Sequence, residues 1–116
     1  EIDVTQTGNM NDSIVNMSTI LDSNSNTIDI AQSGDLNALD ILVEGSGHTI
    51  DIAQTGNENL ITGANGDAML IGGIGIELSI EQVGNGNLVE GDVISGFGSI
   101  AITQVGDWNS ATIVQQ

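Results

Sequence analysis

The sequence contains no cysteine, no proline, no lysine and no arginine. Without cysteine there is no disulfide framework and no thiolate metal site. Because there is no lysine or arginine, the 16 acidic residues give a net charge of −16. This charge argues against nucleic acid and anionic membrane surfaces as partners. No apolar run reaches the roughly 18 residues that a membrane helix needs, so we expect no membrane insertion. No basic segment precedes an apolar one, and we expect any signal peptide to have been removed.

Aromatic residues are nearly absent, since Phe97 and Trp108 are the only two. A chain this acidic can be disordered, but disorder goes with low hydrophobicity, and 39% of these residues are hydrophobic. Most of them are isoleucine, valine and leucine, which predicts an aliphatic, thin core without the rings that usually anchor an interior. A length of 116 residues predicts one domain, spanning 1–116.

A ten-residue motif recurs along the chain. It reads IDIAQSGDLN at 28–37 and IDIAQTGNEN at 50–59, with further copies at 2–11, 78–87 and 100–109. The shared pattern is an aliphatic residue, any residue, Ile or Val, any residue, Gln, any residue, Gly, two residues and Asn. A constant unit with spacers of variable length indicates a repeat architecture. The repeats run approximately over 1–26, 27–48, 49–76, 77–98 and 99–116.

Each repeat is predicted to form a strand, a tight turn and a second strand. Ile28, Ile30 and Gln32 alternate with Asp29 and Ala31, and this period of two is typical of a strand. Glycine followed by Asn or Asp provides turn chemistry. The predicted turn glycines are Gly8, Gly34, Gly56, Gly84 and Gly106. After the motif Asn the alternation resumes, most weakly in the third repeat, where Ile61, Gly63 and Asn65 would face inward.

One such arch is too small to be stable alone. Stacked arches would pair each strand with its copy, in parallel and in register, which predicts an all-β fold: a β-solenoid of five stacked strand-turn-strand repeats. Gln then lies over Gln, and a column of side-chain amides satisfies its own hydrogen bonds. The predicted amide ladder in the core consists of Gln6, Gln32, Gln54, Gln82, Gln104, Asn11, Asn37, Asn59, Asn87, Asn109 and Gln115.

The spacing Gln-x-Gly-x-x-Asn, then a small residue and a second Gln, resembles the curlin repeat. The last unit carries the fullest match, with Gln104, Gly106, Asn109, Ala111 and Gln115. The other units have Met17, Val43, Asn65 and Val93 in place of the second Gln. The resemblance covers about residues 2–115. It implies secretion, self-assembly into extracellular cross-β curli fibres, a role in biofilm and adhesion, and as partners a nucleator subunit and a secretion channel.

The terminal repeats carry no proline or lysine that would block a strand edge. Both ends of the solenoid are therefore expected to be open, and one copy can stack head to tail on the next. The predicted polymerisation edges are Ile2, Val4 and Gln6 at one end, and Ile100, Ile102, Gln104, Ile113 and Gln115 at the other.

The alternative is a monomeric β-roll or solenoid adhesin segment that binds calcium. It is suggested by the stretch GGIGIELSI at 72–80, which has Glu77 where a calcium repeat has Asp. Calcium is the one candidate cofactor; otherwise none is expected. Asp3, Asp29 and Asp51 fall at one repeat position on the outward face. They are expected to form a solvated, solubilising surface; the sharper interpretation is that divalent cations or high salt neutralise their mutual repulsion during assembly.

The remaining features fit a structural protein. His48 is the only histidine and is expected in a loop beside Gly47, so neither a catalytic triad nor a histidine-rich metal site is predicted, and no enzymatic activity is expected. Trp108 is expected at an exposed turn tip. The spacers 17–26 and 63–77 are expected to bulge from the stack.

Overall fold

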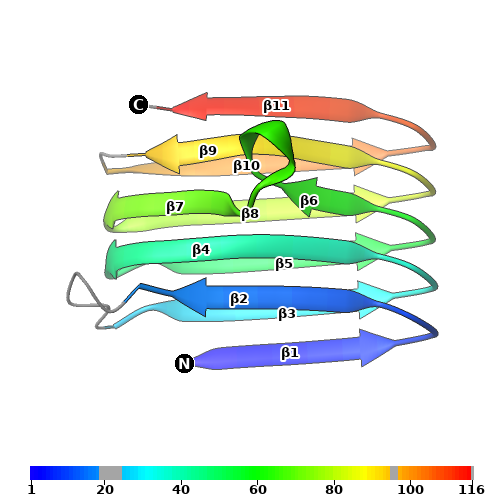
Figure 1. Ribbon diagram of the computed structural model, residues 1–116, viewed down its shortest axis with the longest axis horizontal. Coiled ribbons are helices and arrows are strands. Elements are labelled where there is room, and N and C mark those ends of the chain that lie inside the picture. The colour runs from blue at the N-terminus through cyan, green and yellow to red at the C-terminus, as the bar shows by residue number, and fades with distance from the viewer. Residues whose placement is uncertain (19–24, 95–96, 116) are drawn as a thin grey trace.

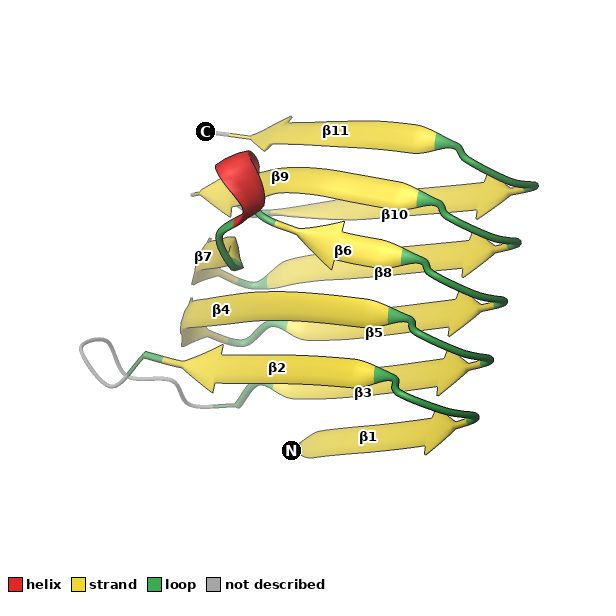
Figure 2. Cartoon of the chain, turned by 45° about the vertical axis from the view of Figure 1, so that its right-hand side comes forward, coloured by secondary structure: helices red, strands yellow, loops and turns green. Residues whose placement is uncertain are grey.

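The computed structural model describes residues 1–18, 25–94 and 97–115. These residues form parallel strands in two facing layers, joined by tight turns (Figures 1 and 2). The strands are β1 (Ile2–Thr7), β2 (Asp12–Met17), β3 (Thr27–Ser33), β4 (Ala38–Ser46), β5 (Thr49–Thr55), β6 (Leu60–Thr62), β7 (Met69–Ile74), β8 (Ile76–Val83), β9 (Leu88–Ile94), β10 (Gly98–Val105) and β11 (Ser110–Gln115), and a single 3₁₀ turn, η1, spans Ala64–Gly66.

The strands alternate between two sheets as the chain advances. Sheet A has the order β1-β3-β5-β8-β10, and sheet B has the order β11-β9-β6-β4-β2, with β7 pairing with β4 and β9. Ile28 pairs with Ile50 and Gln32 with Gln54, so equal positions of successive motifs lie in register. The predicted all-β solenoid is confirmed. The chain makes about four full turns between β1 and β10, and the two ends of the chain lie at opposite ends of the stack (Figure 1).

The core lies between the two sheets and is aliphatic. In β3 the side chains of Ile28, Ile30 and Gln32 are buried, while the residues between them are exposed. Strand β4 supplies Ile41 and Val43 to the same interior, both fully shielded from solvent. Burying each such side chain contributes about 1.5–3 kcal/mol. Parallel pairing therefore stabilises the fold mainly through columns of identical or similar aliphatic side chains.

The third unit breaks the pattern, so five regular repeats are not confirmed. Leu39 pairs with Ile61, but the next inward residue of β4, Ile41, pairs with Met69. The segment 63–68 is thus an insertion that leaves the sheet, and Gly63 N–H closes it by donating to the carbonyl of Asp67 at 2.7 Å.

The insertion corrects two expectations about the third unit. Asn65 does not face inward; it is exposed in η1 with a φ of 62°. The spacer 63–77 bulges only at its start, because β7 and the beginning of β8 occupy most of it. Of the other spacer, 17–26, residues 19–24 lie outside the described residues.

Candidate functional site

The motif glutamines form one continuous column along sheet A. Each side-chain Nε2 donates to the Oε1 of the glutamine in the next unit, at 2.7, 2.7, 2.9 and 2.9 Å. The second hydrogen of the amide crosses to sheet B, where Gln54 Nε2 donates to the carbonyl of Ala38 at 3.1 Å. Because the inner amides are almost completely buried, each depends on these partners. The column contains Gln6, Gln32, Gln54, Gln82 and Gln104.

The motif asparagines form a second column at the turns, with the opposite direction. Asn59 Nδ2 donates to Asn37 Oδ1 at 3.0 Å, and the backbone N–H of Asn59 donates to the same oxygen at 3.1 Å. Asn59 Nδ2 also donates to the carbonyl of Gly84 in the following unit at 2.9 Å. Each of the three inner asparagines, Asn37, Asn59 and Asn87, therefore binds the units on both sides of it. The column contains Asn11, Asn37, Asn59, Asn87 and Asn109.

The motif glycines are required by both their backbone conformation and their close packing. Gly34 has a φ of 116°, and a Cβ built on it would lie 1.9 Å from the carbonyl oxygen of Gly56. A Cβ built on Gly8, Gly56 or Gly84 would likewise clash with the carbonyl oxygen of the motif glycine in the next unit. Gly106 differs, because it belongs to the last unit: the nearest atom to its Cβ position is Asn109 Nδ2, at 3.5 Å. The space above Gly106 is the one a further unit would fill.

Gln115 does not join an amide ladder. It pairs with Val93, and its column otherwise contains Met17, Val43 and Ile71. Its Oε1 is shielded and has no hydrogen-bond partner among the described residues. The inclusion of Gln115 in the ladder was therefore wrong for a single chain, because no amide lies below it.

At each end of the solenoid, the last described strand of each sheet is paired on one side only. Every residue of β1 is exposed, including Ile2 at 48% and Val4 at 42%. At the other end Ile100 and Ile102 of β10 are half-buried. Within the described strands, β1 pairs only with β3 and β10 only with β8, while β2 and β11 occupy the two ends of sheet B. The residues predicted as polymerisation edges thus lie on the end strands.

His48 lies at the corner between β4 and β5, beside Gly47 as expected, but it is completely buried, which sequence reasoning missed. Its Nδ1 lies 3.2 Å from the backbone nitrogen of Ile76, and its Nε2 lies 3.1 Å from the carbonyl oxygen of Glu44. A backbone N–H can only donate, so Nδ1 is an acceptor and the proton sits on Nε2. The sequence did contain a sign that His48 is buried, because residue 48 has the same alternation as the inward-facing Ile50 and Ile52.

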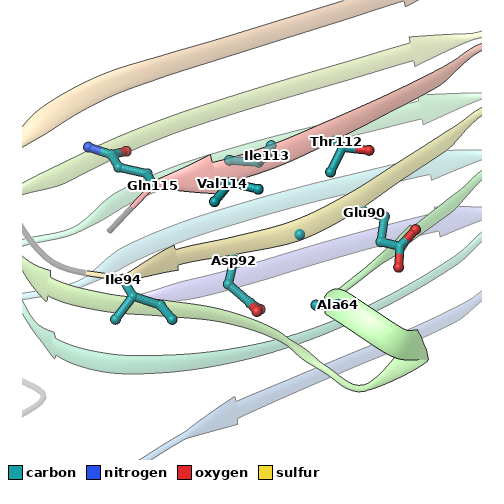
Figure 3. Close-up of a pocket in the computed structure, with 9 residues that line it drawn as sticks. Ala64, Glu90, Asp92, Ile94, Thr112, Ile113, Val114 and Gln115 are labelled. Atoms are coloured by element: carbon teal, nitrogen blue, oxygen red, sulfur yellow. The ribbon is translucent and has the colours of Figure 1, made fainter.

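The outward faces carry the charge. Asp3, Asp29 and Asp51 are exposed register partners on sheet A. On sheet B, a groove of about 300 Å³ lies between η1 and β11 (Figure 3). Its two carboxylates already have partners: Glu90 Oε1 accepts from Asn65 N–H at 3.2 Å, and Asp92 Oδ1 accepts from Leu70 N–H at 3.0 Å. These contacts hold the insertion and β7 in place, which is a structural role.

Among residues 1–18, 25–94 and 97–115, no group of three or more histidine, aspartate or glutamate side chains is arranged to hold a metal ion. Within the same ranges, no helix has the length and hydrophobicity to cross a membrane.

Residues 24–56 match the family model of the curlin associated repeat. This segment is similar to a curlin repeat. It includes β3, β4 and β5 and ends at Gly56, the first residue of the turn after β5. Within it, Gln32 bonds to Gln54 and Gly34 packs on Gly56, and Asn37 belongs to the asparagine column. The resemblance inferred from the motif is therefore confirmed over these residues. No curated protein and no solved structure matches the chain.

Proposed function

We propose that this protein is a structural subunit of a curli-type extracellular fibre and that it polymerises head to tail by stacking its solenoid ends. The single observation that carries this proposal is the complementarity of the two ends. The first and last units present the same motif positions, on strands that each have one open edge in the described chain. The match of residues 24–56 to the curlin associated repeat supports it, because this resemblance implies self-assembly into fibres.

The glutamine and glycine columns continue across such a junction without a change in geometry. Inside the chain, each Gln Nε2 donates to the glutamine above it, so Gln104 at the upper end would donate to Gln6 Oε1 of the next copy. Gln6 Oε1 accepts no hydrogen bond within the described chain. The open space above Gly106 would receive the Gly8 carbonyl of that copy.

The asparagine column supplies the reverse set of bonds. Asn37 donates through both its backbone N–H and its Nδ2 to Asn11 Oδ1. Asn109 Oδ1 would accept the same two bonds from Asn11 of the next copy. The stacked junction thus pairs donors with acceptors in both columns, and the contacts of these columns at the junction resemble those inside the subunit.

The finer parts of the proposal rest on the repeat family. A curli-type subunit is secreted, serves biofilm matrix and adhesion, and works with a nucleator subunit and a secretion channel. We assign no enzymatic activity to the chain, and the filled interior leaves the columns themselves as the functional element. Calcium remains an open candidate only as a counterion for the outward aspartates, not as a structural requirement.

The test is the state of the purified chain. We expect unbranched filaments in electron micrographs and a cross-β reflection at about 4.8 Å along the fibre axis, formed equally well with a calcium chelator present. A protein that stays monomeric at high concentration, or that unfolds on chelation, would favour the calcium-binding β-roll instead.

A further inference from the structure

The tips of the motif turns are stacked one above another at one edge of the solenoid. All five tip residues have a left-handed backbone, with φ between 55° and 64°. Their register is fixed by the backbone: Leu36 N–H donates to the carbonyl of Asn9 at 3.0 Å, and Trp108 N–H donates to that of Asn85 at 2.8 Å. From the first unit to the last, the tip residues are Met10, Leu36, Glu58, Gly86 and Trp108.

Trp108 packs downward on the tip below it. A Cβ built on Gly86 would lie 2.4 and 2.5 Å from two carbons of the six-membered ring of the indole. The ring therefore fills the place of a side chain on Gly86. Only glycine leaves this place free, so the pair is complementary in shape. Trp108 is nevertheless 74% exposed, because no further tip covers it.

Met10 is the tip at the opposite end of the column, and it is 76% exposed. Leu36 lies one level above it, and no tip among the described residues lies below it. Four strand spacings of about 4.8 Å separate the levels of Met10 and Trp108, so the two side chains cannot touch within one chain.

We infer that Met10 of one subunit packs against the indole of Trp108 of the subunit below it, forming a side-chain contact that occurs only at the junction. The inference rests on the proposed head-to-tail stacking, which places Met10 one level above Trp108. In that register Met10 N–H donates to the carbonyl of Asp107, as Leu36 N–H does to Asn9. A methionine sulfur on an aromatic ring is a favourable contact.

This contact gives the junction a chemical identity of its own. The glutamine, asparagine and glycine columns repeat at every level, so they do not distinguish the end of a subunit from its middle. The tip column does distinguish them, because a flexible thioether meets an indole only where two chains join. Met10 and Trp108 are therefore specificity-determining residues of the assembly surface.

Fluorescence tests the contact directly, because Trp108 is the only tryptophan in the sequence. We expect its emission to shift to shorter wavelength, and its quenching by acrylamide to fall, as seeded fibres grow. Met10→Ala should reduce both changes and raise the monomer concentration left at equilibrium about two- to tenfold, the effect of one sulfur–aromatic contact. Combining Met10→Ala with Trp108→Ala should add little to either single change. Ile74→Ala, an exposed apolar truncation away from both ends, is the matched control.

A cross-link gives an independent readout. The sequence has no cysteine, so a chain carrying both Met10→Cys and Trp108→Cys has only these two thiols. Strand neighbours are close enough for a disulfide, whereas residues four levels apart are not. Oxidised fibres should give a ladder of covalent multimers on a non-reducing gel, and a Met10→Cys, Ile74→Cys chain should not. Cross-β fibres without the ladder and without a Met10→Ala effect would overturn the contact alone; a chain that forms no fibres would overturn the proposed function together with it.

Discussion

Gln54 Nε2 donates to Gln82 Oε1 at 2.9 Å although 28 residues separate them, and the same nitrogen donates to the carbonyl of Ala38 in the opposite sheet at 3.1 Å. One side chain therefore connects two units along the stack and two sheets across it. Since Gln54 is fully buried, water cannot replace either bond.

The first prediction compares Gln54 with its exposed neighbour Asp51. Gln54→Leu removes the acceptor of Gln32 and the donor to Gln82, and each orphaned amide group costs about 1–3 kcal/mol. We expect a clear loss of stability in urea unfolding and slower fibre formation in thioflavin assays. Asp51→Asn is the control, because it relieves repulsion from Asp29 at an exposed position and should speed assembly or leave it unchanged. If Asp51→Asn assembles more slowly than Gln54→Leu, the glutamine column is not what holds the stack.

The second prediction concerns His48. Replacing it by leucine would leave the N–H of Ile76 and the carbonyl of Glu44 unpaired in a buried corner. We expect the free energy of unfolding to fall by about 2–5 kcal/mol, measured by urea denaturation of the monomer. Thr49→Ala next to it changes an exposed side chain and should stay within about 0.5 kcal/mol of the wild type. An unchanged midpoint for His48→Leu would mean that the imidazole is dispensable.

The repeated motif made most of the fold predictable. Five glutamines in phase with aliphatic positions fix both the inward face and the register, because a slip by one residue would turn Gln32 and Ile30 outward together. The tight turns followed from glycine next to Asn or Asp. The residues of the glutamine, asparagine and glycine columns could therefore be predicted from the motif alone.

The parts that could not be predicted are positions where the sequence pattern fits the motif but also fits a different placement in the structure. Asn65 is in phase with the inward residues of the third unit, but the chain leaves the sheet at Thr62 and returns at Met69, and parity alone cannot reveal an insertion. Gln115 matches the motif, yet its column below is aliphatic. The phase of residue 48 with Ile50 could have placed His48 inward, but its hydrogen-bond partner Ile76, 28 residues further along the chain, could not be predicted.

The third prediction uses the difference between the last glycine and the inner ones. Gly84→Ala would place a Cβ 2.0 Å from the carbonyl of Gly106 within the same chain, so it should destabilise the monomer. Gly106→Ala carries backbone strain at a φ of 111° but meets no backbone atom above it. We expect the Gly106→Ala monomer to unfold at higher urea concentration than Gly84→Ala and yet to elongate seeds poorly, because its methyl group occupies the place of the incoming Gly8 carbonyl. Normal elongation by Gly106→Ala would contradict stacking at this end.

The fourth prediction concerns charge. Stacking places a −16 subunit on another one, and the aspartates of β1, β3 and β5 lie in register on one face. Raising the ionic strength from about 0.01 M to about 0.15 M shortens the Debye length from about 30 Å to about 8 Å. We expect the elongation rate of seeded fibres to rise over this range. Triple replacement of Asp3, Asp29 and Asp51 by asparagine should weaken the salt dependence, whereas rates insensitive to salt in the parent chain would exclude repulsion as a barrier.

The last prediction tests the end strands through the direction of their backbone groups. Ile28 N–H donates to the carbonyl of Glu1, and Gly34 N–H donates to that of Thr7, so the odd-numbered residues of β1 face β3. In a parallel strand, successive residues direct their groups to opposite sides. The N–H of Val4 therefore points away from the stack, into the junction.

The same reasoning applies at β10. Gly106 N–H donates to the carbonyl of Val83, so the even-numbered residues of β10 face β8. The N–H of Ile102 therefore points to β8, and the N–H of Thr103 points to the open side.

Val4→Pro and Thr103→Pro each remove one junction donor and no bond within the chain. Ile102→Pro instead removes a bond to β8 and is the matched control. We expect the first two variants to keep a monomer stability near that of the parent chain but to elongate seeds slowly, and Ile102→Pro to unfold more easily. The measurements are seeded thioflavin kinetics and urea unfolding of each monomer. A double variant with Val4→Pro and Thr103→Pro that grows fibres at the parent rate would refute elongation through these two edges.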